Sequence, residues 1–149
     1  MKKIMLVGKS GCGKTTLSQR LMDMPVEYKK TQAIEVVGSD IMDTPGEYME
    51  RKEFYKALIV SSVDADVILM LQSCVDEQFT FSPRMGSMFN RPMIGVVTKT
   101  DLAESPSQIS TAEELLQLAG VEKTFQVGFG CEDGVSSLRD FLCKEEIEN

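Results

Sequence analysis

A short apolar run that leads into a glycine-rich segment restricts the fold of this chain more than any other feature. Residues 3–7 read KIMLV, and the next nine residues, 8–16, read GKSGCGKTT. This segment matches the pattern G-x-x-x-x-G-K-[ST], in which successive backbone N–H groups wrap around phosphate oxygens. Because the pattern functions only between a strand and a helix, the sequence predicts a phosphate-binding loop at such a junction.

Each position of the predicted loop has a role in holding a nucleotide. The Lys14 ammonium would reach the β- and γ-phosphates, and the Thr15 hydroxyl would bind Mg²⁺. The other loop positions would contact the nucleotide, and these are Gly8, Lys9, Ser10, Gly11, Cys12, Gly13 and Thr16. We therefore predict a nucleoside-triphosphate site that includes a magnesium ion.

Strand and helix patterns alternate along the rest of the chain. A helix begins near Lys14 and ends at Pro25, and Gly38-Ser39 between two short runs predicts a tight hairpin. Helices are expected at 51–62, 110–119 and 135–145, and strands at 66–71, 92–97 and 124–127. This order predicts one α/β domain over residues 1–149, with a mostly parallel sheet, helices on both faces and one antiparallel hairpin edge. The acidic tail at 145–149 is expected to fray.

A second motif, D-T-P-G at residues 43–46, ends the second strand of the predicted hairpin. The Asp43 carboxylate is suited to hold the Mg²⁺ shell, and the Gly46 N–H to contact a γ-phosphate. Aspartate and glycine are also common in ordinary turns. The position of this motif after the phosphate-binding loop favours the nucleotide role.

A third motif, T-K-T-D at residues 98–101, directly follows the predicted strand at 92–97. In GTP-binding folds an aspartate in this place accepts two hydrogen bonds from the guanine ring, which assigns that role to Asp101. The Lys99 stem would pack along the base plane, and Thr98 opens the motif. The plain alternative is a polar turn in which Asp101 caps the next helix. Three motifs in this order, each at a strand end, indicate a P-loop nucleotide-binding domain.

Charge and composition exclude several other functions. The chain has 149 residues and a formal net charge of −7, which argues against duplex nucleic acid or an anionic membrane surface as a partner. It contains no histidine, so histidine-based acid–base and metal chemistry is absent. Its four cysteines lack a C-x-x-C pair. No membrane-length apolar run or signal-peptide pattern is present, and we expect a cytoplasmic protein.

The three motifs resemble those of small GTPase-like P-loop proteins, and the resemblance can be narrowed. KKTQAIEV, DTPGEY and NRPMIGVVTKTDLA are similar to segments of the EutP/PduV family of ethanolamine- and propanediol-utilisation proteins, with the PduV side closer. The similarity runs from Lys2 to Leu142. It implies a bacterial cytoplasmic protein associated with metabolic microcompartments, whose shell or enzyme proteins would be its partners. Phosphoryl transfer involving acetate is also associated with this family.

The resemblance implies roles for further residues and also shows where this chain departs from GTPases. Thr31 falls at the switch threonine that completes the Mg²⁺ shell, and Glu47 falls where many GTPases carry a water-orienting glutamine. Gly128-Phe129 falls at the Ser-Ala motif whose backbone recognises guanine. Asp101 favours GTP, whereas the bulk of Phe129 leaves ATP open. No arginine is clearly placed as a finger, with Arg51 and Arg84 as the candidates, and we therefore expect slow hydrolysis.

Three functions therefore remain open from the sequence. The first is a GTPase-like switch in which GTP orders Thr31 and the 43–46 segment. The second is an ATP-dependent acetate kinase, which would need a cation such as Lys29, Lys30 or Arg51 to hold the acceptor. The third is an interaction module that holds nucleotide without hydrolysing it and recruits a partner.

Overall fold

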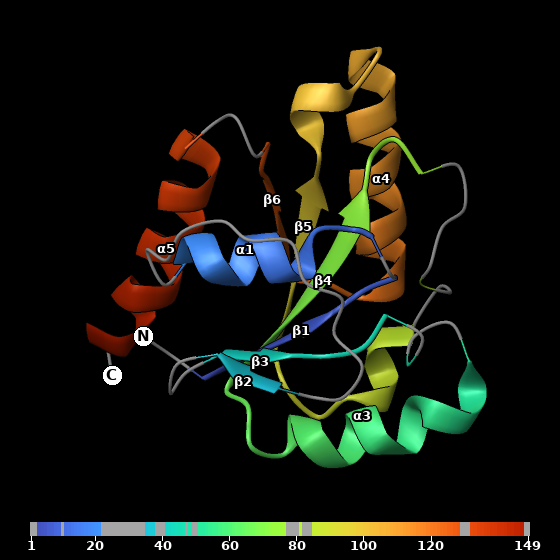
Figure 1. The fold of residues 1–149 in the computed structure, drawn as a ribbon, viewed down its shortest axis with the longest axis vertical. Helices are drawn as coiled ribbons and strands as arrows, with labels where there is room; N and C mark the ends of the chain where they lie inside the picture. Colours follow the sequence, from blue (N-terminus) through green and yellow to red (C-terminus); the bar gives the residue numbers. More distant parts are fainter. Residues whose placement is uncertain are drawn as a thin grey trace.

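Six strands form a single sheet in the order β2-β3-β1-β4-β5-β6 (Figure 1). The computed structural model describes residues 3–9, 11–21, 35–37, 41–46, 48, 51–76, 81, 85–128 and 132–147. The strands are β1 (Ile4–Val7), β2 (Glu35–Val37), β3 (Ile41–Asp43), β4 (Val67–Ser73), β5 (Met93–Thr98) and β6 (Lys123–Gln126). The α-helices are α1 (Lys14–Leu21), α3 (Tyr55–Ser62), α4 (Pro106–Ala119) and α5 (Glu132–Ile147). Short 3₁₀ helices are η1 (Lys52–Phe54), η2 (Met85–Met88) and η3 (Thr100–Leu102).

The pairing of the strands confirms the predicted fold class. β1 lies beside β3 and β4, and β4-β5-β6 continue the sheet, all in parallel. β2 pairs antiparallel with β3, with Glu35 opposite Asp43 and Val37 opposite Ile41. The predicted Gly38-Ser39 turn lies outside the described residues. Because five of the strands are parallel, their carboxyl ends meet at one edge, where ligands bind in open α/β sheets.

Both faces of the sheet are covered by helices, as the sequence predicts. Ile4 and Leu6 of β1 pack with residues of α1 and α5 in one fully apolar layer. Met5 and Val7, which point to the opposite face, pack with residues of α3 and α4 in a second layer. All four side chains are completely buried, which explains why β1 is an uninterrupted apolar run.

Several predicted element ends are wrong, and tertiary contacts explain them. α4 begins at Pro106 rather than at residue 110, because Ser105 is extended and a proline is well suited to the first helical turn. β4 and β5 continue to Ser73 and Thr98, since these two polar residues pair with each other in the ladder. α5 also begins earlier, at Glu132, and runs to Ile147. The end of the first helix at Pro25 lies outside the described residues.

Replacing Gly134 by alanine is expected to destabilise the protein, although alanine is the better helix former by about 1 kcal/mol. A Cβ at this position in α5 would lie only 2.4 Å from the backbone oxygen of Gln126, at the end of β6. That overlap requires the backbone to move, and we expect Gly134→Ala to lower the free energy of unfolding by about 1–3 kcal/mol. Urea unfolding measures this. Ser136→Ala, at an exposed position of the same helix, is the matched control and should change stability by less than about 0.5 kcal/mol.

Candidate nucleotide site

The glycine-rich loop connects β1 to α1, as its pattern requires. Gly11 and Gly13 have φ angles of +82° and +103°, a left-handed conformation that L side chains rarely adopt. The turn is closed by the Cys12 N–H, which donates to Lys9 O at 3.1 Å. These two glycines therefore allow the backbone to curl into the shape that directs N–H groups toward an anion.

Lys14 is held inside this loop. Its side chain is buried, and its ammonium donates hydrogen bonds to Gly8 O at 2.8 Å and to Lys9 O at 3.2 Å. These carbonyls fix the position of the positive charge within the curl of the loop. The loop backbone at the amino end of α1 and this ammonium together form a site suited to the phosphates of a nucleotide.

Thr15 and Asp43 form the candidate metal position. The Thr15 hydroxyl donates to Asp43 Oδ2 at 2.7 Å, although the two residues are 28 positions apart. One hydroxyl and one carboxylate are hard oxygen donors that suit Mg²⁺, which usually completes its shell with phosphates and water. The described residues contain no group of three or more acidic or cysteine side chains able to hold a metal by themselves. The donor set therefore fits a magnesium ion that arrives with a phosphate ligand.

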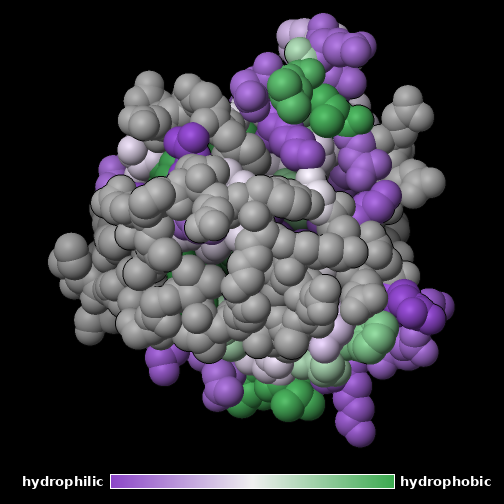
Figure 2. Space-filling view, in the orientation of Figure 1, coloured by the Kyte–Doolittle hydropathy of each residue, from purple (hydrophilic) through white to green (hydrophobic). Residues whose placement is uncertain are grey.

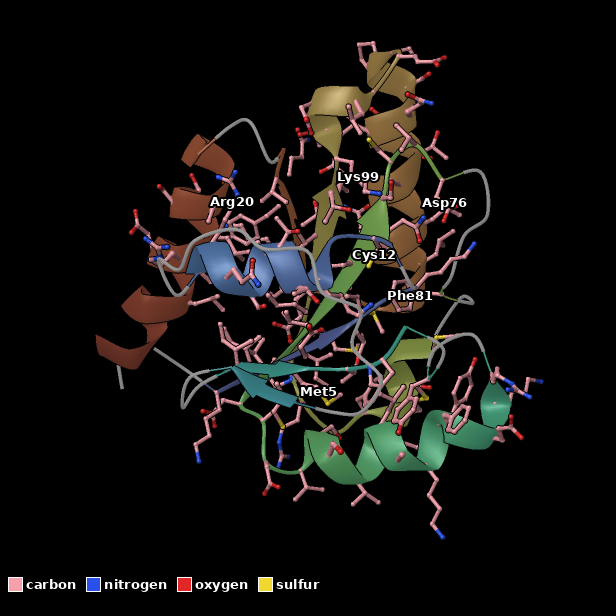
Figure 3. All side chains as sticks on the ribbon, viewed as in Figure 1. Met5, Cys12, Arg20, Asp76, Phe81 and Lys99 are labelled. Atoms are coloured by element: carbon pink, nitrogen blue, oxygen red, sulfur yellow. The ribbon has the colours of Figure 1, made fainter. Side chains whose placement is uncertain are left out.

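The T-K-T-D motif lies against the same loop. The Thr98 hydroxyl donates to Cys12 O at 2.6 Å and ties the end of β5 to the phosphate loop. Lys99 has a φ of +60°, an uncommon angle for a residue other than glycine, and it turns the chain so that Asp101 is exposed in η3. Figure 3 shows Cys12 and Lys99 near one another at this end of the sheet.

Gly128 lies directly beside Asp101. A Cβ at Gly128 would approach Thr100 Oγ1 to 2.9 Å and the Asp101 N atom to 3.0 Å. The segment that follows β6 therefore contacts the T-K-T-D motif, at the place where the sequence predicts a second wall for the base. No side chain fits at Gly128 without displacing that motif.

The structure brings most of the predicted site residues to the carboxyl edge of the parallel strands. These are Gly8, Lys9, Gly11, Cys12, Gly13, Lys14, Thr15, Thr16, Asp43, Gly46, Thr98, Lys99, Asp101 and Gly128. Ser10, Thr31, Glu47 and Phe129 lie outside the described residues, as do Lys29, Lys30 and Arg84. Arg51 is engaged elsewhere, because its Nε lies 2.9 Å from Glu53 Oε1 on the exposed start of η1.

Two residues that support the site were not singled out in the sequence. The Thr44 hydroxyl, fully buried, donates to Leu6 O at 2.6 Å and fixes the end of β3 against β1. The Cys74 thiol donates to Lys99 O at 3.4 Å and supports the left-handed turn at Lys99 in the T-K-T-D motif, the candidate base motif. Thr44 lies within the D-T-P-G motif, although no role was predicted for it, and Cys74 has no sequence signal beyond its position after a buried strand.

The Cys12 thiol is buried beneath the loop. Loss of hydration raises the pKa of Cys12 above its usual value of 9.0, and the positive charges of Lys14 and Lys99 offset only part of this effect. The neutral thiol is therefore the form present near pH 7. This argues that Cys12 serves the loop through its backbone and its packing rather than as a reactive thiolate.

The raised pKa of Cys12 predicts a loss of stability in alkaline solution. Above about pH 9 the unfolded chain releases this proton while the folded chain retains it, so the unfolded state binds fewer protons and stability falls. The slope from this one group is at most about 1.4 kcal/mol per pH unit. Urea unfolding between neutral pH and about pH 10 measures it. The free energy of unfolding of Cys12→Ala should decline less steeply with pH than that of the wild type. Equal slopes for the two proteins would show that Cys12 does not contribute.

Comparison with known proteins identifies the family. The family model described as "Ethanolamine utilisation - propanediol utilisation", PduV-EutP, matches residues 1–144. The chain belongs to the PduV-EutP family. The propanediol utilization protein PduV of Citrobacter freundii is 43% identical over 146 residues, which cover 98% of this chain and 96% of that protein. A protein of Escherichia coli named "Probable acetate kinase EutP" is 31% identical over 143 residues, which cover 95% and 89% of the two chains.

A solved structure supports the fold of this PduV-EutP member. Translation elongation factor SelB from Methanococcus maripaludis, crystallised with the GTP analogue GPPNHP, matches with a TM-score of 0.66 and 19% identity. The match covers 96% of this chain and 33% of the SelB chain. The match shows that this chain has the fold of that part of the SelB chain. In the described part of this chain, no helix is long and apolar enough to cross a membrane.

Proposed function

We propose that this chain binds a guanine nucleoside triphosphate with Mg²⁺ and hydrolyses it slowly, as a GTPase-like component of ethanolamine or propanediol utilisation. The observation that carries the proposal is the convergence of three distant motifs on one edge of the sheet. The Thr15–Asp43 hydrogen bond of 2.7 Å joins the phosphate loop to the magnesium ligand. The Thr98–Cys12 hydrogen bond of 2.6 Å joins the same loop to the base motif.

Each part of this edge has a role that its chemistry supports. The loop N–H groups and Lys14 would bind the phosphates, and Thr15 and Asp43 would hold Mg²⁺, which supplies charge neutralisation when bound. Asp101 would accept the two N–H groups of guanine. The resemblance places no arginine clearly as a finger and puts Glu47 where many GTPases carry glutamine, so slow turnover is the expected rate.

An acetate kinase is the second candidate, and the relative named "Probable acetate kinase EutP" favours it. In that reaction a carboxylate oxygen of acetate attacks the γ-phosphorus of ATP while the bond from this phosphorus to the β–γ bridging oxygen breaks. Acetyl phosphate and ADP are the products. Arg51 forms an exposed ion pair with Glu53, and Lys29 and Lys30 are the other cations named for the acceptor.

A non-hydrolysing interaction module is the third candidate. The outer side of α3 is partly apolar, and Figure 2 shows a hydrophobic patch at the lower edge of the molecule, where α3 lies. Ile59, Val60 and Val63 are 38%, 62% and 64% exposed. Since α3 follows the D-T-P-G segment, such a surface suits a partner whose binding responds to nucleotide, such as a protein of a bacterial microcompartment in the cytoplasm.

Calorimetric titration with Mg-GTP and, separately, with Mg-ATP tests the three candidates. Tight GTP binding without ATP binding, followed by slow release of phosphate, supports the GTPase-like function. Preference for ATP, with ADP and acetyl phosphate formed only when acetate is added, supports the kinase instead. Binding of GTP without any turnover favours the interaction module. Failure to bind either nucleotide contradicts all three.

A further inference from the structure

A small cleft lies between the end of β4 and the first half of α4. Its volume is about 250 Å³, and one wall is formed by residues 72–76. Ser107, Gln108, Thr111, Ala112 and Leu115 of α4 form the other wall. Ligand pockets commonly measure about 300–1,000 Å³, so this cleft lies just below that range and has room for a small ligand. Gln72, Ser73, Cys74 and Ala112 are buried, which places the floor of the cleft away from water.

The lining favours a ligand that donates hydrogen bonds and carries no negative charge. Hydroxyl and amide groups come from both walls. Those of Gln72, Ser73, Ser107 and Gln108 already take part in hydrogen bonds within the protein, and the Thr111 hydroxyl lies at an exposed position. The one charged residue of the lining is Asp76, and the lining contains no lysine or arginine. The lining offers a carboxylate or phosphate no cation of its own, although the Lys9 ammonium beside Asp76 offsets part of the negative charge.

The Asp76 carboxylate already forms an ion pair with an ammonium group. The Lys9 ammonium lies 3.5 Å from Asp76 Oδ2, and about 30% of each side chain is exposed (30% and 28%). An ion pair in contact with solvent contributes little stability, so another ammonium can replace Lys9 at this carboxylate. Figure 3 shows Asp76 at the same end of the sheet as Cys12 and Lys99.

We propose that this cleft binds a short amino alcohol, with its ammonium on Asp76 and its hydroxyl among the hydroxyl groups of the α4 wall. Both ends of such a molecule match the lining, whereas a diol matches only the hydroxyl groups. An amino alcohol of four non-hydrogen atoms can reach a dissociation constant of about 0.1–10 mM. Ethanolamine, which the family description names, is therefore the first probe.

Occupation of the cleft should change the affinity of the nucleotide site. The wall at residues 72–76 is joined to the base motif, since Cys74 N–H donates to Thr98 O at 3.1 Å and its thiol donates to Lys99 O. The ligand also competes with Lys9 for Asp76, and a Lys9 ammonium that turns away from Asp76 would add positive charge to the phosphate loop. Nucleotide and amino alcohol should therefore tighten each other's binding by the same factor. This coupling rests on the proposed function, whereas binding to the cleft does not.

Titration of the full chain with ethanolamine, 1,2-propanediol and acetate tests the cleft, with protein NMR as the readout. Ethanolamine should shift resonances of residues 72–76 and of α4, propanediol should bind at least about tenfold more weakly, and acetate should not bind. Asp76→Asn should weaken ethanolamine binding about tenfold, and Thr111→Leu, which removes a hydroxyl and narrows the cleft, should weaken it by a similar factor. Asp64→Asn and Ser110→Leu, at exposed positions outside the lining, are the matched controls.

Three results would overturn the proposal. These are no shift with ethanolamine, acetate binding as strong as that of ethanolamine, and unchanged ethanolamine binding in both cleft variants. A second titration, of Mg-GTP with and without saturating ethanolamine, tests the coupling. A roughly threefold gain in affinity that disappears in Lys9→Met supports it, and equal affinities reject it. If no nucleotide binds, the proposed function fails, and the NMR titration still decides the cleft.

Discussion

Lys14→Ala is expected to weaken the binding of Mg-GTP by about 10²–10⁴-fold, and that of Mg-ATP equally if ATP binds. The reason is that the ammonium would form charge-assisted hydrogen bonds with the β- and γ-phosphates, each with a contribution of about 1.5–3 kcal/mol. The structure holds this group in place through Gly8 O and Lys9 O at 2.8 and 3.2 Å. Calorimetric titration measures the loss.

Two further variants separate a binding defect from a folding defect. Lys14→Met keeps the length of the buried side chain and removes its charge, so it should lose nucleotide while its melting temperature stays near that of the wild type. Lys56→Ala removes a lysine from the exposed side of α3, away from the loop, and should bind nucleotide normally. A dissociation constant for Lys14→Ala within about threefold of the wild-type value would exclude the loop as the phosphate site.

Asp101→Asn is expected to weaken Mg-GTP binding about a hundredfold and to change Mg-ATP binding by less than about threefold. A carboxylate accepts both the N1–H and the 2-amino group of guanine, whereas the asparagine NH₂ faces one of these donors with another donor. The same chemistry predicts a gain for Mg-XTP, because xanthine has a carbonyl in place of the 2-amino group. Asp101 is exposed, so its replacement should leave the fold intact.

This change in preference is measured by the competition of Mg-GTP, Mg-ATP and Mg-XTP, each in turn, against a fluorescent guanine nucleotide. Glu104→Gln is the matched control, since it alters charge in the same way at a nearby exposed position. If Asp101→Asn and Glu104→Gln bind GTP alike, Asp101 does not contact the base. Adenine specificity and the kinase function would then become the better account of the site.

The architecture was predictable because the signals for it are local. The continuous apolar run of β1 and the glycines of the loop allow only a strand-to-helix junction in which Gly11 and Gly13 adopt positive φ angles. The hairpin at β2 and β3 also follows from a local turn pattern. The ends of elements were less predictable, because pairing in the sheet decides them. Ser73 and Thr98 look like loop residues, yet each forms part of the ladder with the other.

The composition of the candidate site was largely predictable, whereas its supporting contacts were not. The candidate site residues could be identified from the spacing and order of three motifs, G-x-x-x-x-G-K-T, D-T-P-G and T-K-T-D. Nothing in the sequence relates Thr44 to Leu6, or Cys74 to Lys99, because these partners are 38 and 25 residues apart. The cleft beside α4 has no sequence signal, since its two walls come from separate segments and its lining residues are common types.

By itself, the sequence determined the fold class and the family, and it named the candidate phosphate, metal and base motifs, because these motifs are short-range patterns of residue type. Only the tertiary structure decided that Thr15 meets Asp43, that Thr98 holds Cys12, and that Gly128 borders Asp101. These contacts exist because the parallel strands β1, β3 and β5 end at one edge of the sheet. Their register places residues that are far apart in the chain within hydrogen-bonding distance, and a local pattern does not encode that register.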